Sequence, residues 1–463
     1  MNFKTLNLES RVQYPEDIQA LGKKLMAKKK YKYLVIGNSA GGIGCIEGIR
    51  RVDPKGTIAV VSEEKHHTYS RPLITHLLEG DVDRRGMDFR PRSFYSGHGV
   101  EPYLGYRALD LDTEKRSVNL QSSKGEGRYS LSFEKLLVAT GGKPFIPPME
   151  GLDLDGVTPM ITLEQSLEIK KKLGRVRNAV VLGAGLIGTK TAEALSHQVE
   201  KVSMVELADR ILSPVTDPVS SNMAAEAFRR NGVDVLLGST ITEIRGNGKG
   251  RVREVLLRDG RVLPCELLVV AIGVRPRTEI LEGTAVALAS MKIGGGVDVD
   301  TNMETSVEGV YACGDCAHAH DFVTGGMRLL PLWPNAYIGG RIAGMNMTGS
   351  SHQHRWATNM NSVDFFGFPM VSAGFMLKPD KRGFEEITRA EDGRYSKVIL
   401  RDDVIQGLIM AGDVDRAGIY LGLMREKVRT TSFKDQLLTD DFAVVHLPLE
   451  VREKIKKPIM EIE

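Results

Sequence analysis

The sequence has few cysteines, no long apolar run and almost no net charge. Four cysteines among 463 residues are too few for a disulfide scaffold, so we expect a reducing, cytoplasmic setting. No apolar segment reaches membrane-spanning length, and charged residues precede the first apolar stretch, which argues against a secretory signal. A formal net charge of +3 is too small to indicate nucleic-acid binding.

What the chain does contain is ordinary for a globular protein. It is 42% hydrophobic and 26% charged, and its length suffices for about three domains. Cations are bunched locally in two runs. Such runs are usually solvated faces, and the alternative is a docking surface for an acidic protein partner. The runs comprise Lys23, Lys24, Lys28, Lys29, Lys30 and Lys32, then Arg84, Arg85, Arg90 and Arg92.

Two glycine-rich turns lie roughly a domain apart. GNSAGG occupies residues 37–42 after the apolar run 33–36, and GAGLIG occupies residues 183–188 after the apolar run 179–182. Each turn is expected to end a strand and open a helix, where backbone N–H groups can hold a dinucleotide pyrophosphate. Strand and helix alternate in both units, which predicts two parallel, doubly wound Rossmann-like sheets.

In the first turn, Gly37 permits the tight bend and Gly42 permits close packing of helix on strand. Ser39 stands where a second glycine is usual, and its small side chain still allows a pyrophosphate to approach. The next strand is followed by Glu63 and Glu64. Either carboxylate could accept hydrogen bonds from an adenosine ribose, and the sequence leaves the choice open.

The second turn has all three glycines of the pattern, and the strand after it ends at Glu206. This spacing suits a carboxylate that binds the ribose 2′-hydroxyl. Because a carboxylate repels a 2′-phosphate, we expect NAD rather than NADP, although Arg210 nearby keeps NADP open.

Further motifs follow in a recognisable order. They are Ala139-Thr140-Gly141, then Ala271-Ile272-Gly273, then Thr305-Ser306 through to Gly314-Asp315. Together with the two turns, they resemble the FAD/NAD-linked two-dinucleotide flavoprotein reductases, which share the pyridine nucleotide-disulfide oxidoreductase fold. The resemblance implies FAD on the first turn, NAD(H) on the second, and Asp315 on the FAD ribityl chain.

The resemblance also implies a domain plan. We expect an α/β fold with two Rossmann-like nucleotide-binding domains, the FAD domain interrupted by the NAD domain, plus a C-terminal α+β interface domain that forms a homodimer. The expected segments are an N-terminal extension 1–30, FAD-binding segments 31–150 and 275–349, an NAD-binding segment 151–274 and an interface segment 350–463.

Disulfide reductases of this family carry redox cysteines soon after the first ribose-binding strand, and residues 66–76 here contain none. A thiol relay at that position is therefore excluded. The stretch Tyr69-Ser70-Arg71-Pro72 instead resembles reductases whose flavin passes electrons directly to an iron–sulfur protein or rubredoxin. The resemblance places Arg71 and Pro72 beside FAD.

A second departure concerns charge near the flavin. Many relatives pair a lysine with a glutamate at the places occupied here by His76 and Lys190. A cation near the flavin ring would stabilise its anionic reduced form, so both residues are candidate catalytic groups. The alternatives are a structural histidine and a partly exposed helix lysine.

The expected cofactor-binding set combines these motifs with two further positions, Ala108 and Ile187. It comprises Gly37, Ser39, Gly42, Glu63, Glu64, Arg71, Pro72, Ala108, Ala139, Thr140, Gly141, Gly314, Asp315, Gly183, Gly185, Ile187, Gly188, Glu206 and Gly273.

The cysteine-histidine run after Cys313 has metal-like spacing, but it coincides with the expected FAD turn. We therefore expect no metal there and take all four cysteines as core residues.

The sequence thus predicts an FAD-dependent NAD(H):acceptor oxidoreductase whose partner is an iron–sulfur protein or subunit of ferredoxin or rubredoxin type. Direction and acceptor stay open. The alternatives are an NADH oxidase that reduces oxygen at the flavin, and an FAD- and NADH-responsive redox sensor or assembly protein.

Overall fold

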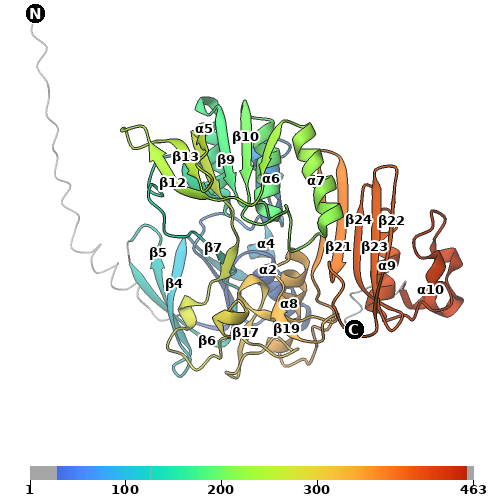
Figure 1. Cartoon of the computed structure of the whole chain (residues 1–463). Coiled ribbons are helices and arrows are strands. Elements are labelled where there is room, and N and C mark those ends of the chain that lie inside the picture. The colour runs from blue at the N-terminus through green and yellow to red at the C-terminus, as the bar shows by residue number, and fades with distance from the viewer. Residues whose placement is uncertain (1–28, 126, 456–463) are drawn as a thin grey trace, which may run out of the picture.

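The computed structural model describes residues 29–125 and 127–455 (Figure 1). The N-terminal extension as far as residue 28, with the first three lysines of the first basic run, lies outside the described residues. Lys29 and Lys30 already belong to the first strand. No helix in the described part of the chain is long and apolar enough to cross a membrane.

The first sheet is parallel around β1, the strand that leads into the first glycine turn. Strand β1 pairs in parallel with β2 and β6, β3 extends the sheet beyond β2, and β17 lies parallel beside β6. Ile36 is aligned with Val61 and Val138, and Val138 with Ala312, so four strands end at one edge. Antiparallel β4 and β5 continue the sheet. The bounds are β1 Lys29–Ile36, β2 Ile58–Ser62, β3 Val100–Leu104, β4 Tyr106–Asp112, β5 Ser117–Ser122, β6 Arg128–Val138 and β17 Val310–Ala312.

The second sheet repeats this design with five parallel strands in the order β11-β10-β9-β15-β8. Leu182 is aligned with Val205 on one side and Val270 on the other, so β9, β10 and β15 also end together. A small antiparallel sheet of β12, β13 and β14 accompanies it. The bounds are β8 Val157–Pro159, β9 Asn178–Leu182, β10 Lys201–Val205, β11 Val233–Leu236, β12 Ile241–Gly246, β13 Val252–Leu257, β14 Val262–Pro264 and β15 Leu267–Val270.

Two short strands join the sheets. β7 (Gly142–Pro144) leads out of the first sheet, β16 (Val274–Pro276) leads back, and the two pair antiparallel. This double crossing lies between the upper and lower sheets in Figure 1. The crossing falls near the predicted boundaries at 150/151 and 274/275, which themselves stay a prediction.

The C-terminal region is an antiparallel sheet in the order β20-β21-β24-β23-β22, with helices α9 and α10 beside it (Figure 1). A hairpin of β18 and β19 precedes it. The predicted fold class is confirmed: parallel Rossmann-like sheets are followed by a separate α+β region. The bounds are β18 His318–His320, β19 Met327–Leu329, β20 Met360–Phe365, β21 Phe368–Gly374, β22 Phe384–Glu391, β23 Arg394–Arg401, β24 Val404–Ala411, α9 Ala417–Arg425 and α10 Leu449–Ile455.

Helices α2 (Ala40–Val52) and α8 (Trp333–Met347) pack with their backbones in close approach. A Cβ added at Gly340 would overlap the carbonyl of Gly41, and one added at Gly44 would overlap the carbonyl of Tyr337. The other helices that accompany the two parallel sheets are α3 Ile74–Glu79, α4 Phe94–Gly97, α5 Leu163–Lys172, α6 Leu186–Ser196 and α7 Pro218–Arg230. Because α2 begins at the first glycine turn, α8 braces the helix that presents that turn.

Replacing Gly340 with alanine is therefore expected to destabilise the protein by about 1–3 kcal/mol, because the added methyl group overpacks a backbone contact. Urea unfolding measures the change. Gly418→Ala in α9 is the matched control, because a Cβ there meets nothing within 4 Å. It should leave stability unchanged or raise it slightly. Equal stability of Gly340→Ala and wild type would contradict the packing account.

His354 is a buried imidazole behind the same helix. It is 2% exposed, and neither of its ring nitrogens has a hydrogen-bond partner among the described residues. Burial, with a smaller contribution from His320, lowers the pKa of His354 to about 4. The folded chain thus holds this ring neutral at pH values where an unfolded histidine is already protonated.

The neutral His354 ring makes the stability of the folded protein depend on pH. Above about pH 6.5 both states hold a neutral ring. As the pH falls toward 4 only the unfolded state gains the proton, so stability is lost across that window. Between pH 7 and pH 4.5, we expect the free energy of unfolding of His354→Leu to fall by about 2 kcal/mol less than that of wild type. Urea unfolding at the two pH values measures the difference. An identical pH dependence in both proteins would show that the ring is not held neutral.

Candidate functional site

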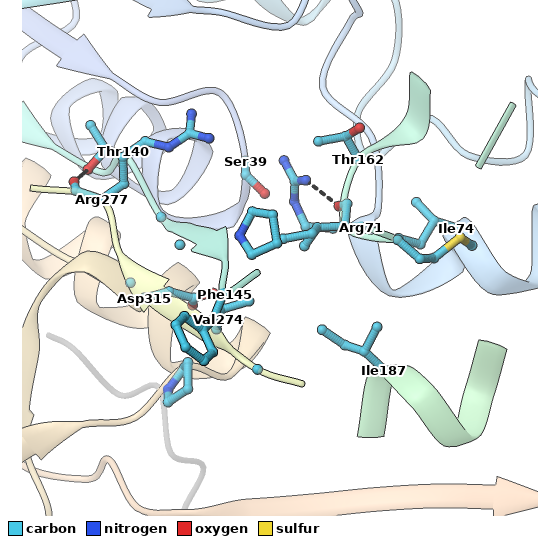
Figure 2. Close-up of a pocket in the computed structure, with 18 of the residues that line it drawn as sticks. Ser39, Arg71, Ile74, Thr140, Phe145, Thr162, Ile187, Val274, Arg277 and Asp315 are labelled. Carbon is cyan, nitrogen blue, oxygen red and sulfur yellow. Dashed lines mark hydrogen bonds between the residues drawn. The ribbon is translucent and has the colours of Figure 1, made fainter. Parts of the chain in front are cut away.

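A cavity of about 1220 Å³ lies where the aligned strand ends of the two sheets face each other. Both glycine turns line it, as do the crossing strands and the start of α8. Figure 2 shows residues from these separate segments around one space, with Ser39, Asp315 and Ile187 on different walls. Such a position, at the carboxyl ends of parallel strands, is where doubly wound sheets bind nucleotides.

The first turn is shaped for a phosphate. Gly37 has φ +122, and a Cβ there would overlap the carbonyl of Ala139; a Cβ at Gly42 would overlap the carbonyl of Gly37. Ser39 precedes α2, and its side chain caps none of the helix N–H groups. Because residues 37–41 line the cavity, the N-terminus of α2 faces it with N–H groups that the helix itself does not pair, and this favours an anion.

Asp315 lies in the short 3-10 turn Gly314–Cys316 after β17, where Gly314 has φ +77. Its carboxylate lies inside the cavity (Figure 2). Burial raises the pKa of Asp315, and the positive charge of Arg71 partly lowers it again. A buried acceptor with a cation nearby suits the hydroxyl groups of a ligand.

The structure separates the two candidate ribose carboxylates. Glu64 accepts a hydrogen bond from the Arg71 guanidinium at 2.7 Å and another from the Tyr69 hydroxyl at 2.7 Å. Arg71 also donates to the carbonyl of Ile161 at 2.6 Å (Figure 2). Glu63 directly follows β2, where it contacts Arg277 at 2.8 Å. Glu64 thus fixes Arg71, and Glu63 is the better placed of the two for a ribose.

The second turn repeats the geometry of the first. Gly183 has φ +104, and its Cβ would lie 2.5 Å from the carbonyl oxygen of Ala271. A Cβ at Gly188 would overlap the carbonyl of Gly183, whereas at Gly185 nothing lies within 4 Å. Gly185 therefore leaves an open approach to the backbone at the start of α6.

Glu206 lies at the end of β10 and lines the cavity. Its carboxylate accepts from the backbone N–H of Ala184 at 2.6 Å and of Ala208 at 2.8 Å. Arg210 instead bonds Asp209 at 2.9 Å and the carbonyl of Ser213 at 3.4 Å, and it does not line the cavity. The wall near the second turn is therefore acidic.

The structure treats the two candidate catalytic residues differently. Lys190 lines the cavity, where its ammonium donates to the Glu193 carboxylate and to the carbonyl of Asp364 at 3.1 Å. His76 does not line the cavity, and its ring contacts Asp81 at 3.3 Å. The reason is helical geometry: α3 turns Ile74 and Thr75 toward the cavity, which leaves His76 on another face. We therefore drop the catalytic role for His76.

The cavity gathers most of the predicted cofactor-binding residues. Gly42 and Gly188 do not line it and act in helix packing instead. The lining members are Gly37, Ser39, Glu63, Glu64, Arg71, Pro72, Ala108, Ala139, Thr140, Gly141, Gly314, Asp315, Gly183, Gly185, Ile187, Glu206 and Gly273.

Several lining residues were missed from the sequence. Trp333 borders the cavity from the start of α8, and Phe145 borders it with the Arg275 guanidinium 4.0 Å from its ring centroid. No motif marks these positions. Thr162 and Gln165 form a capping box at the start of α5, and their T-x-x-Q spacing could have been recognised.

The cysteines offer no reactive thiol. Cys313 and Cys316 are buried, burial raises the pKa of both thiols, and the Cys316 thiol donates to the carbonyl of Cys313 at 3.3 Å. A thiol that stays protonated is a poor nucleophile and a poor ligand. Neither belongs to a group of metal-ligating side chains within the described residues.

The described members of the basic runs are mostly paired. Lys29, Lys30 and Lys32 bond Glu101, Glu134 and Asp53 respectively. Likewise Arg84 and Arg92 share Asp88, and Arg90 bonds Glu47. These pairs match the solvated-face interpretation better than a free docking surface.

Comparison with known proteins bears on the same residues. The model of the pyridine nucleotide-disulphide oxidoreductase family matches residues 31–340, and that of the rubredoxin NAD+ reductase C-terminal domain matches residues 360–428. The epsilon subunit of the NADH-dependent phenylglyoxylate dehydrogenase from Aromatoleum evansii is 31% identical over 89% of this chain and 96% of its own length.

Two further relatives carry related names. The rubredoxin-NAD(+) reductase of Pseudomonas putida is 28% identical over 69% of this chain and 80% of its own length. The crystal structure of the ferredoxin reductase for the CYP199A2 system from Rhodopseudomonas palustris superposes with a TM-score of 0.74 at 25% identity, covering 84% of this chain and 93% of the other.

The family matches extend over both glycine turns, the crossing strands and the C-terminal sheet. The glycine turns and the crossing strands, which the first match covers, line the cavity. The chain belongs to the pyridine nucleotide-disulphide oxidoreductase family, carries a rubredoxin reductase C-terminal domain, and is a flavin-dependent NAD(P)H oxidoreductase of that family.

Proposed function

We propose that the protein passes electrons between NAD(H) and an iron–sulfur protein or subunit of ferredoxin or rubredoxin type. The observation that carries this proposal is one cavity that both glycine turns line and whose lining cysteine, Cys313, is buried with the pKa of its thiol raised. A protonated, buried thiol does not suit the electron transfer through cysteines that disulfide reductases use. Electrons from a dinucleotide would therefore pass directly to an external acceptor. Relatives named as rubredoxin and ferredoxin reductases support the choice of partner.

The residues present fit FAD on the first turn. The open N-terminus of α2 would hold the pyrophosphate, Glu63 the adenosine ribose, and Asp315 the ribityl hydroxyls. Arg71, which Glu64 holds in place, and Pro72 also line the cavity. Bound FAD would supply the conversion between two-electron hydride transfer and one-electron transfer.

NAD(H) would lie along the second turn, with its pyrophosphate at the start of α6 and its adenosine ribose on Glu206. Gly185 leaves the backbone open for this approach. The acidic wall, with Arg210 directed elsewhere, supports NAD over NADP. Lys190 would bring positive charge to the wall between the two dinucleotides, where it would stabilise a reduced, anionic ring.

The C-terminal sheet supports a homodimer only through its likeness to the rubredoxin reductase C-terminal domain. The dimer therefore stays part of the proposal, as do the predicted domain boundaries.

Glu206→Gln is expected to raise the KM for NADH about tenfold or more with little change in kcat, because a hydrogen bond to a charged acceptor contributes about 1.5–3 kcal/mol. The preference for NADH over NADPH should fall as well. Steady-state kinetics with both nucleotides measure these changes. Glu200→Gln, at an exposed position just before β10, is the matched control and should behave like wild type. Equal KM values for Glu206→Gln and wild type would remove Glu206 from the nucleotide site.

The proposed electron transfer is tested anaerobically with FAD-loaded protein and a purified rubredoxin or ferredoxin. Because the direction is open, one reaction contains NADH with the oxidised iron–sulfur protein, and the other contains NAD+ with the reduced one. We expect two iron–sulfur centres to change oxidation state per nucleotide in at least one direction, followed by absorbance.

Three outcomes of this experiment, taken with a parallel reaction in air that follows oxygen consumption, separate the proposal from its alternatives. Steady oxygen consumption at the rate of reduction by NADH, with no transfer to either iron–sulfur protein, would identify an oxidase. Reduction by NADH without turnover on any acceptor would identify a sensor or assembly protein. Transfer to the iron–sulfur protein at rates above oxygen consumption supports the reductase.

A further inference from the structure

Helix α3 ends beside the end of α6, away from the cavity, in a group of side chains whose types can bind a metal ion. His76, Glu79 and Asp81 each offer one ligand atom, and these atoms all lie within 4.8 Å of one another. Among residues 29–125 and 127–455 no other group of three or more histidine, cysteine, aspartate or glutamate side chains has this arrangement.

The local backbone brings these three side chains together. Gly80 ends α3 with φ +106, and the N–H groups of Gly80 and Asp81 both donate to the carbonyl of His76, at 2.9 and 3.0 Å. The chain therefore folds back over the last turn of the helix, and Asp81 comes to lie beside His76. The His76 Nδ1 and Asp81 Oδ2 atoms are 3.3 Å apart. Two ligands of a tetrahedral zinc ion, each bonded at about 2.1 Å, are separated by about 3.4 Å.

Glu79 is held in place by the end of α6. His197, the residue after that helix, places its Nδ1 2.6 Å from a Glu79 carboxylate oxygen, and the Gln198 amide donates to the Glu79 backbone carbonyl at 2.9 Å. A hydrogen-bonded partner of this kind orients a ligating carboxylate and commonly changes metal affinity 10–100-fold when removed. The Glu79 side chain is only 17% exposed, whereas that of Asp81 is 57% exposed, so the group is anchored on one side and open to solvent on the other.

The electrostatics of the location also favour a cation. Glu79 and Asp81 carry two negative charges, and the carbonyl end of α6 adds partial negative charge. One cation is already near, because the Lys170 ammonium donates to the carbonyl of Leu77 at 2.7 Å. The Lys170 ammonium bonds this backbone carbonyl of α3, and no bond from it to the side chains of His76, Glu79 or Asp81 is present among the described residues.

We propose that His76, Glu79 and Asp81 form a binding site for a divalent transition metal of the zinc class, with His197 orienting Glu79. An imidazole with two carboxylates suits such an ion better than Mg²⁺ or Ca²⁺, which prefer oxygen ligands alone.

A bound ion would act on the cavity through the two helices. Ile74 at the start of α3 and Ile187 at the start of α6 both line the cavity, and Figure 2 shows them on the same side of it. An ion that fixes Glu79 and its contact with His197 would tie the far ends of these helices together. The predicted effect is a protein that melts at a higher temperature when the metal is bound.

The test uses full-length, FAD-loaded protein without an affinity tag, freed of metals by a chelator. Zn²⁺ is titrated in competition with a chromophoric chelator, and thermal melting is followed with Zn²⁺ and with Mg²⁺. We expect one Zn²⁺ per chain with micromolar or tighter affinity, and a rise in melting temperature with Zn²⁺ that the same concentration of Mg²⁺ does not produce.

The variants locate the site. Glu79→Gln and Asp81→Asn should weaken Zn²⁺ binding at least tenfold, and His197→Ala should weaken it 10–100-fold. Glu168→Gln on neighbouring α5 removes an exposed carboxylate and should bind Zn²⁺ like wild type. Asp81 is the more exposed of the two carboxylates, so Asp81→Asn tests the site even if Glu79→Gln fails to fold. Absence of saturable one-to-one binding, or wild-type affinity in Asp81→Asn, would overturn the proposal.

Discussion

The structure depends on one repeated steric constraint. At each glycine-rich turn, the carbonyl of the residue that follows the neighbouring strand occupies the space in which a side chain would lie. Ala139 presents its carbonyl to Gly37 in the first sheet, and Ala271 presents its carbonyl to Gly183 in the second. Only glycine fits, and its positive φ turns the chain straight into a helix. Two helix N-termini are thereby aimed into one cavity, and the other walls are built around them.

The close approach of backbones extends outward from the first turn. Glycines on α2 and α8 let the two helices touch, and α8 starts with Trp333 on the cavity wall. The crossing strands β7 and β16 perform the corresponding task between the sheets, since they carry residues such as Val274 from one nucleotide unit to the other (Figure 2). The cavity thus has closely packed backbone on several sides, which would suit the proposed alignment of two dinucleotide rings.

The sequence predicted the fold class and most of the cavity because the information is local. A glycine turn between a strand and a helix, such as residues 183–188, specifies both the conformation and the side of the sheet. The structure places His76 away from the cavity, because a position inferred from relatives does not determine which face of α3 the side chain occupies. The sequence could not choose between Glu63 and Glu64, because the contact of Arg71 with Glu64, which leads us to propose Glu63 for the ribose, depends on how the chain after β2 folds. Trp333 and Phe145 reach the cavity only through long-range packing, which no motif records.

The central claim is that the two turns hold their dinucleotides so that the reactive rings meet inside this single cavity. The most direct measurement is anaerobic rapid-mixing reduction of the FAD-loaded protein by NADH deuterated at nicotinamide C4, with each of the two stereoisomers used separately. If the nicotinamide is held with one face toward the flavin, reduction slows several-fold with one stereoisomer and not with the other. Equal rates for both stereoisomers and unlabelled NADH, in a reaction where hydride transfer limits the observed rate, would contradict the account.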